Sequence, residues 1–215
     1  MKIIPSINTE TFEIAKQRID TLKDLTKEFH LDISNLDFAN FQTWNNPKEL
    51  DRLDENLKLQ VHLMIRLKPQ EILKWTNYRI KTLILHLEAC QLPHALIKFA
   101  KKLKKEIIIS WSPLIEKEFI DEFVRFVNGL LILGVYPGKS GQELLPSTFE
   151  RLKTALEYKL KLKKFKIFVD GGIDKDNIKE IIKYRPDYII LGKAIFEGDP
   201  RKNFLFFSNL VKFYF

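Results

Sequence analysis

The chain has 215 residues, of which 45% are hydrophobic and 12% aromatic, which is enough to bury a sizeable core and argues against disorder. Its 36 Lys and Arg against 28 Asp and Glu give a net charge of +8, which favours an anionic partner. The basic residues are spaced as on solvated helix faces, and no nucleic-acid-reading motif accompanies them, so we expect no nucleic acid among the partners.

A single cysteine, Cys90, excludes an intrachain disulfide and a cysteine-based metal site, and it favours a reducing compartment. The first apolar run is interrupted by Pro5 and is too short for a signal peptide, and no later run is long enough to span a bilayer. We therefore expect a cytoplasmic protein without a membrane partner.

Short apolar runs alternate with amphipathic, helix-like segments from one end of the chain to the other. Eight strands are predicted, and they begin near Lys2, Glu28, Lys58, Thr82, Glu106, Gly129, Lys166 and Tyr188. Helical segments are predicted over residues 9–26, 47–55, 69–77, 91–104, 116–127, 146–160, 175–183 and 200–215. Eight βα units of about 25 residues fit a closed parallel barrel better than an open sheet. The sequence therefore predicts an α/β protein, a (β/α)8 TIM barrel that forms a single domain over residues 1–215.

Polar side chains gather near the predicted carboxyl ends of the first four strands. Within a strand, side chains alternate between two faces, and in a barrel one of these faces points to the axis. The residues that share such a face, opposite apolar neighbours, are Ser6 in the first strand, His30 and Asp32 in the second, Gln60, His62 and Met64 in the third, and His86 and Glu88 in the fourth. Since barrel enzymes place their active sites at these strand ends, we expect the side chains to converge there.

Two histidines and two aspartates near this rim, His30, Asp32, His62 and Asp170, point to a metal site. A lone histidine in a strand is more often a hydrogen-bonded core residue. Two carboxylates in a partly buried site, however, need a cation to offset their repulsion, and two imidazoles with two carboxylates suit a divalent transition metal. We therefore predict that these four side chains bind a metal ion.

Glycine-rich loops follow the last three predicted strands. Gly171 and Gly172 come directly after the seventh strand, where they free the backbone for positive φ and let a ligand approach peptide N–H groups. The loop 136–142 (YPGKSGQ) follows the sixth strand, and Gly192 and Lys193 follow the eighth. Taken separately these are ordinary turns and a solvent-facing lysine. Together they predict a phosphate site at the corner where barrels commonly bind one.

Seven short motifs together give the chain a family resemblance. They are PSIN at 5–8, HLD at 30–32, VHLM at 61–64, HLEA at 86–89, VYPGKSGQ at 135–142, VDGGI at 169–173 and GKAIF at 192–196. In this order, with one on most strands, they resemble ribulose-phosphate 3-epimerases over nearly the whole chain. The resemblance implies an enzyme of the pentose phosphate pathway that interconverts D-ribulose 5-phosphate and D-xylulose 5-phosphate. It also implies one divalent metal ion (Zn, Fe, Mn or Co).

The resemblance assigns roles to individual residues as well. Asp32 and Asp170 match the acid/base pair that moves a proton at C3 through an enediolate, and with His30 and His62 they match the metal ligands. The residues expected to bind the sugar phosphate are Ser6, His62, Met64, Gly138, Lys139, Ser140, Gly141, Gln142, Gly171, Gly172, Gly192 and Lys193.

The chain departs from the family pattern close to the expected substrate. Residues 34–36 read Ser-Asn-Leu where the family usually has Met-Asp-Gly, and Leu133 replaces a family methionine. Lys139 and Ser140 occupy the middle of the phosphate loop, and Lys193 replaces a small polar residue. Two alternatives therefore stay open: a 3-epimerase of a six-carbon ketose phosphate such as allulose 6-phosphate, and a non-catalytic sugar-phosphate-binding protein.

The C-terminal segment NFLFFSNLVKFYF is rich in aromatic residues. We expect it to form a last helix that covers the barrel wall, and the alternative is a subunit interface. The protein is expected to be a homo-oligomer.

Overall fold

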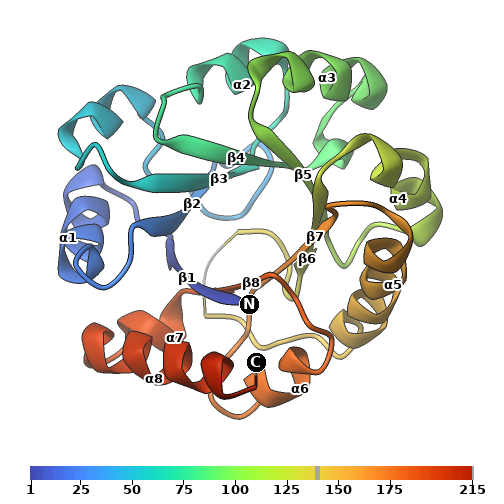
Figure 1. The fold of residues 1–215 in the computed structure, drawn as a ribbon. Helices are drawn as coiled ribbons and strands as arrows, with labels where there is room; N and C mark the ends of the chain where they lie inside the picture. Colours follow the sequence, from blue (N-terminus) through green and yellow to red (C-terminus); the bar gives the residue numbers. More distant parts are fainter. Residues whose placement is uncertain (139–140, 215) are drawn as a thin grey trace.

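The computed structural model describes residues 1–138 and 141–214. Its eight strands are parallel and pair in sequence order, and β8 closes on β1, so they form the closed barrel seen in Figure 1. The strands are β1 (Lys2–Ile7), β2 (Glu28–Ser34), β3 (Lys58–Met64), β4 (Ile80–Leu85), β5 (Glu106–Trp111), β6 (Gly129–Leu133), β7 (Lys166–Asp170) and β8 (Tyr188–Leu191). The predicted (β/α)8 TIM barrel is confirmed.

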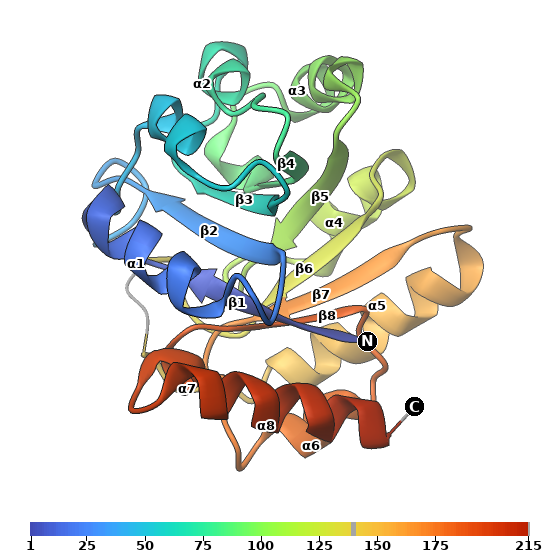
Figure 2. The same ribbon diagram turned by 60° about the vertical axis from the view of Figure 1, so that its left-hand side comes forward.

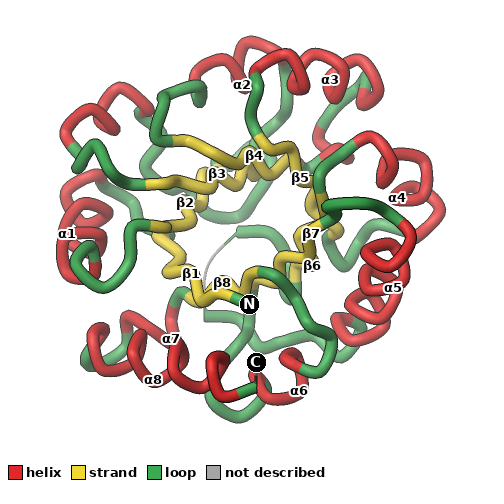
Figure 3. Tube along the Cα trace, in the orientation of Figure 1, coloured by secondary structure: helices red, strands yellow, loops and turns green. Residues whose placement is uncertain are grey.

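Helices surround the barrel on its outside, as Figures 2 and 3 show. The α-helices are α1 (Phe12–Leu22), α2 (Pro69–Lys74), α3 (Pro93–Ala100), α4 (Lys117–Phe123), α5 (Thr148–Lys161), α6 (Ile178–Ile182), α7 (Lys193–Phe196) and α8 (Pro200–Phe213). Four 3₁₀ helices are η1 (Pro47–Arg52), η2 (Leu87–Ala89), η3 (Lys101–Leu103) and η4 (Val124–Phe126). Over the described ranges, no helix combines the length and the apolar character needed to cross a membrane.

The structure differs from several of the predicted elements. The pattern predicts a helix over residues 47–55, but only the 3₁₀ helix η1 forms, because no side chain caps its start and Leu53 returns to extended backbone. β4 begins at Ile80, slightly before the predicted start at Thr82. The one-turn helix α7 is absent from the prediction because four residues are too few to show a helical period.

The inside of the barrel is layered along its axis. A layer of apolar side chains fills the middle, and it consists of Ile4, Ile84, Ile108, Leu131, Phe168 and Ile190. At the amino ends of the strands, Lys2 pairs with Glu28 at 2.6 Å and Lys166 with Glu106 at 2.5 Å. The polar residues predicted to form the active site lie beyond the apolar layer, at the carboxyl ends.

Helix α8 covers the barrel wall beside β1 and packs against α1 and α7. Phe204, Phe207 and Val211 are buried on its inner face, whereas Leu205 and Phe206 are 45% and 47% exposed. The predicted covering role of the C-terminal segment is therefore confirmed. A subunit interface on the exposed face stays a prediction.

Candidate active site and metal centre

Four side chains converge at the carboxyl ends of β2, β3 and β7. His30, Asp32, His62 and Asp170 are buried, and each offers one ligand atom that lies within 4.8 Å of the other three. His30 Nε2 lies 3.3 Å from Asp32 Oδ1 and 3.7 Å from Asp170 Oδ2. His62 Nδ1 lies 3.0 Å and 3.8 Å from the same two oxygens. The parallel strands thus bring the four predicted metal ligands together.

The arrangement fits a divalent cation. Imidazole nitrogens and carboxylate oxygens are common ligands of transition metals. His30 Nε2 is buried and makes no hydrogen bond, which is costly for a polar atom unless a ligand occupies it. In each ring, the nitrogen that does not face the carboxylates has a polar partner. His30 Nδ1 lies 3.3 Å from Gln60 Oε1, and His62 Nε2 lies 2.9 Å from His86 Nε2. The cluster could therefore hold one metal ion with both rings already oriented.

Burial and neighbouring groups shift the pKa values of the two aspartates in opposite directions. Burial opposes the ionisation of Asp32, but the adjacent rings of His30 and His62 outweigh it and lower the pKa of this carboxyl. Burial, together with the charge of Asp32, raises the pKa of Asp170 to about 7. Burial lowers the pKa of His62 to about 4, so this ring is neutral near pH 7 and keeps a lone pair for a metal. The pKa of His30 is lowered by burial but raised more by the two carboxylates, and the net shift is upward.

Asp32 has a further partner on β1. The Ser6 hydroxyl donates a hydrogen bond of 2.5 Å to Asp32 Oδ2, and both residues are buried. Since Oδ1 of the same carboxylate faces His30 and His62, both of its oxygens are engaged. The orientation of Asp32 is therefore fixed from two sides.

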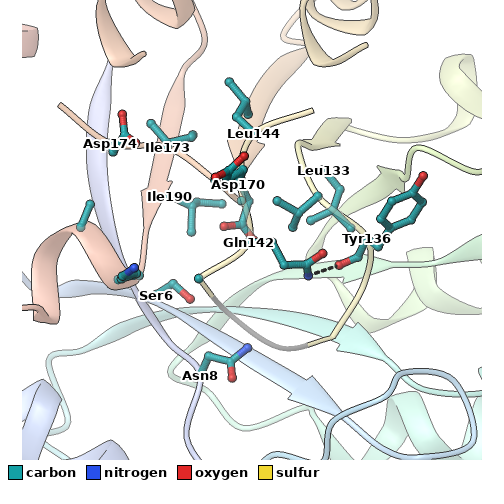
Figure 4. Close-up of a pocket in the computed structure, with 18 of the residues that line it drawn as sticks. Ser6, Asn8, Leu133, Tyr136, Gln142, Leu144, Asp170, Ile173, Asp174 and Ile190 are labelled. Atoms are coloured by element: carbon teal, nitrogen blue, oxygen red, sulfur yellow. Dashed lines mark hydrogen bonds between the residues drawn. The ribbon is translucent and has the colours of Figure 1, made fainter. Parts of the chain in front are cut away.

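A cavity of about 660 Å³ opens above this cluster, and Figure 4 shows part of its lining. The predicted site residues that line it are Ser6, Asp32, His62, Met64, Gly138, Gly141, Gln142, Asp170, Gly171, Gly172, Gly192 and Lys193. His30 is fully buried and is not among the described residues that line the cavity. Lys139 and Ser140 fall outside the described residues. The volume suits a small organic ligand.

The two glycines after β7 have the positive φ angles that the sequence predicts, +96° for Gly171 and +70° for Gly172. A β-carbon at Gly172 would lie 2.3 Å from the backbone nitrogen of Leu144, and one at Gly171 would lie 2.6 Å from Val135. Glycine is therefore required here for the loop after β6 to pack directly on the loop after β7. Contact of these glycines with a phosphate stays a prediction.

Lys193 begins α7 at the edge of the cavity, and its side chain is 60% exposed. Its ammonium lies 3.8 Å from Glu197 Oε2, one turn further along the chain. An exposed ion pair of this length contributes little stability, so it does not prevent the ammonium from turning toward the cavity. The predicted contact between Lys193 and a phosphate remains open to test.

The sequence analysis did not single out Asn8 and Asn177, which also line the cavity. Asn8 lies two residues after Ser6, and its amide donates a hydrogen bond of 3.3 Å to the carbonyl of Gly138. The alternation that marks the other strand ends would have pointed to Asn8. Asn177 donates a hydrogen bond of 2.8 Å to the carbonyl of Gly172 from a turn, and no sequence period marks such a position.

Comparisons with known proteins agree with the motifs. A family model described as the ribulose-phosphate 3 epimerase family matches residues 2–196. Ribulose-phosphate 3-epimerases of Chlamydia trachomatis and Chlamydia pneumoniae are 28% and 30% identical over 66% and 67% of this chain, and the match spans 63% and 64% of their own lengths. The solved 3-hexulose-6-phosphate synthase from Salmonella typhimurium shares the fold, with a TM-score of 0.73 over 100% of both chains at 16% identity. Because the family match runs through almost the entire barrel, the chain belongs to the ribulose-phosphate 3-epimerase family.

Proposed function

We propose that the protein is an isomerase that interconverts D-ribulose 5-phosphate and D-xylulose 5-phosphate by inverting the configuration at C3. The observation that carries the proposal is the convergence of His30, Asp32, His62 and Asp170 beneath a cavity of about 660 Å³. Membership of the family supports the same chemistry. The Chlamydia relatives bear the name of this epimerase, which makes a pentose phosphate the first substrate to test.

Inversion at C3 requires one group that removes a proton and a second group that returns a proton to the opposite face. Asp32 enters the site from β2 and Asp170 from β7, and β1 and β8 separate these strands in the closed sheet. A sugar bound in the cavity would therefore lie between two carboxyl groups that reach it from different strands. One aspartate takes the C3 proton, an enediolate forms, and the other aspartate supplies a proton on the far side.

The opposite pKa shifts of the two aspartates suit these roles. The lowered pKa of Asp32 keeps it ionised and ready to act as the base. Without a bound cation the pKa of Asp170 is raised to about 7, so this carboxyl takes up a proton more readily than Asp32 does, which suits the acid. After one turnover the two protonation states are exchanged, so the reverse reaction uses Asp170 as the base.

His30, Asp32, His62 and Asp170 are the residues that would hold a divalent metal ion. When bound there, the ion would polarise the C2 carbonyl and stabilise the negative charge that develops on the substrate oxygens. The inward-facing nitrogens of His30 and His62 would be its imidazole ligands, and Ser6 keeps Asp32 in position through its hydrogen bond.

The phosphate of the substrate would bind where the loops after β6, β7 and β8 meet. Gly141, Gly171, Gly172 and Gly192 line this part of the cavity, and Lys193 stands beside it. The net charge of +8 also favours an anionic ligand. With the phosphate in this corner, the sugar carbons can extend toward Asp32 and Asp170.

A six-carbon ketose phosphate such as allulose 6-phosphate is the second candidate substrate, because residues 34–36, where β2 ends, depart from the family pattern. Steady-state kinetics on both sugar phosphates tests the choice. The proposal expects the higher kcat/KM for ribulose 5-phosphate, and a higher kcat/KM for the six-carbon sugar would contradict it. A protein that binds both and turns over neither would be the non-catalytic alternative.

A further inference from the structure

The two nitrogens of His62 lie in different surroundings. Nδ1 faces the carboxylate of Asp32 at 3.0 Å, inside the proposed metal cluster. Nε2 points away from the cluster and lies 2.9 Å from His86 Nε2. The other nitrogen of His86, Nδ1, lies 2.8 Å from Glu88 Oε1. A chain of polar contacts therefore runs outward from His62 through His86 to a carboxylate.

The carboxylate of Glu88 determines which atom donates and which accepts in each of these contacts. An ionised carboxylate can only accept a hydrogen bond, so His86 Nδ1 must carry a hydrogen and donate a hydrogen bond to Glu88. If Nδ1 carries the one N–H of the His86 ring, Nε2 keeps a lone pair and accepts a hydrogen bond from His62 Nε2–H. The lone pair of His62 is left on Nδ1, the atom that faces Asp32 and Asp170.

We propose that Glu88 and His86 are positioning residues that fix His62 in its Nε2–H tautomer and leave Nδ1 free to bind the divalent cation. The inference rests on the metal site of the proposed function and names two further residues that act on it. Neither His86 nor Glu88 is among the described residues that line the cavity, so they act through His62 and not on the substrate. Through the His86 ring, the carboxylate of Glu88 also increases the basicity of His62.

The local structure holds this pair in place. His86 follows the last residue of β4, and its ring is fully buried. It lies nearly parallel to the His62 ring, with centroids 5.0 Å apart and an interplanar angle of 14°, and the Phe38 ring packs against it at 5.0 Å. The 3₁₀ helix η2 begins at the next residue and turns Glu88 back toward the His86 ring. The backbone thus places a carboxylate two residues after the histidine that it orients.

His30 offers an internal comparison. Its outer nitrogen, Nδ1, faces Gln60 Oε1 at 3.3 Å, so its second partner is a neutral amide at a longer distance. The two proposed imidazole ligands are therefore oriented with different strengths. We expect His62 to depend more on its outer partners than His30 does.

The direct test is nitrogen-15 NMR of the histidine rings in the full chain loaded with Zn²⁺. Long-range proton–nitrogen correlations distinguish the two tautomers of each ring. The expected spectrum shows His62 protonated on Nε2 with the metal on Nδ1, and His86 protonated on Nδ1. A His62 ring that binds Zn²⁺ through Nε2, or a His86 ring protonated only on Nε2, would overturn the inference without any variant.

Variants test whether these residues strengthen metal binding. The Zn²⁺ affinity of each metal-free protein is measured without substrate, by competition with a chromophoric chelator. Glu88→Ala is expected to weaken Zn²⁺ binding about tenfold, at the lower end of the effect of losing a direct partner of a ligand, because Glu88 acts through His86. Glu88→Gln keeps an acceptor oxygen for His86 and is expected to weaken binding less than Glu88→Ala does. Ser110→Ala is the control, since this buried β5 hydroxyl has no hydrogen-bond partner among the described residues.

Thermal unfolding of the metal-free proteins shows whether each variant folds. A folded Glu88→Ala protein that binds Zn²⁺ within about twofold of wild type contradicts the inference. Failure of the inference and failure of the proposed function are distinguishable. The ring tautomers and the Zn²⁺ affinity are measured without substrate, whereas the function is tested by turnover of the wild-type enzyme.

Discussion

Asp32 and Asp170 lie in one buried cluster but ionise differently. The rings of His30 and His62 lie 3.3 Å and 3.0 Å from Asp32, whereas they lie 3.7 Å and 3.8 Å from Asp170, whose pKa is set mainly by burial. The pKa of Asp32 is therefore lowered, whereas the pKa of Asp170 is raised to about 7. This difference leads to the sharpest expectations for single residues.

Substitution of either aspartate should abolish proton transfer on one face of the sugar and preserve it on the other. Asp170→Asn should lower net epimerisation by at least about 100-fold, yet Asp32 should still exchange the C3 proton of one epimer with solvent. Asp32→Asn should give the mirror pattern with the other epimer. Net turnover and deuterium exchange are measured separately from each epimer with metal-saturated protein. Either variant retaining more than about a tenth of the wild-type kcat would rule out the two-aspartate mechanism.

Metal binding should depend on pH in a defined direction. Asp170 must lose its proton to act as a ligand, and its pKa is raised to about 7 by burial and by the charge of Asp32. Below pH 7 the affinity should therefore fall about tenfold for each pH unit from this group alone, and above pH 7 it should level off. Titration with Mn²⁺ between pH 5.5 and about 8.5 checks this, with one ion per chain at saturation. An affinity that does not change over this range would show that no proton is displaced.

Lys193 is the residue that most distinguishes the proposed phosphate site from the family pattern. If its ammonium contacts the phosphate, Lys193→Ser should raise KM several-fold and leave kcat nearly unchanged, because the phosphate is bound equally in the ground and transition states. Lys175→Ser is a suitable control, since Lys175 is exposed and does not line the cavity. An unchanged KM at low salt would place the Lys193 side chain in solvent.

Most of the candidate site could be predicted from the sequence, because the two-residue alternation along a strand decides which side chains face the barrel axis. The faces of His30, Asp32 and His62 follow from this period, and the structure confirms them. The contact of His62 with His86 could not be predicted, since it depends on the spacing of β3 and β4 and on ring rotation. Backbone crowding at Gly172 could not be predicted either, because it is caused by a loop distant in sequence.

At the scale of elements, helix α5 is fastened to the sheet by one buried arginine. Arg151 Nη1 donates hydrogen bonds of 2.7 Å and 2.8 Å to the carbonyls of Trp111 and Leu133, at the ends of β5 and β6. Burial lowers its pKa to about 10, so it is still charged at neutral pH. The side chain therefore satisfies two strand-end carbonyls next to the cavity.

Removing this link should cost stability. Arg151→Met leaves two buried carbonyls without a donor and should lower the free energy of unfolding by about 3 kcal/mol. Lys153→Met on the exposed side of the same helix should change it by less than about 0.5 kcal/mol. Urea unfolding of the metal-free proteins measures both. Equal stabilities for the two variants would contradict the assigned role of Arg151.

The strands could be predicted more accurately than the helices, and the reason is physical. Each strand is a short apolar run buried on both faces, so its limits are visible in the sequence, and the predicted starts of β1, β2 and β3 agree with the structure. Helix ends depend on caps and on tertiary packing. For this reason the predicted segment 175–183 became the shorter α6, and residues 47–55 formed only η1.

At the scale of the whole molecule, the barrel separates its two ends. Ion pairs at the amino ends and a layer of apolar side chains leave the carboxyl ends as the face where the cavity opens. The alternation of strands and helices predicts this architecture, since a closed parallel barrel collects the strand ends at one rim. The details of the substrate depend on loops that this architecture does not determine.

The central claim is that this rim moves a proton at C3 of a ketose phosphate, and solvent exchange tests it most directly. Wild-type protein saturated with Mn²⁺ is incubated with D-ribulose 5-phosphate in deuterium oxide, and the sugar is followed by proton NMR. We predict the formation of D-xylulose 5-phosphate with deuterium at C3, and we predict that removing the metal abolishes it. If the sugar phosphate binds to the metal-loaded protein and its C3 proton does not exchange, the proposed function is wrong.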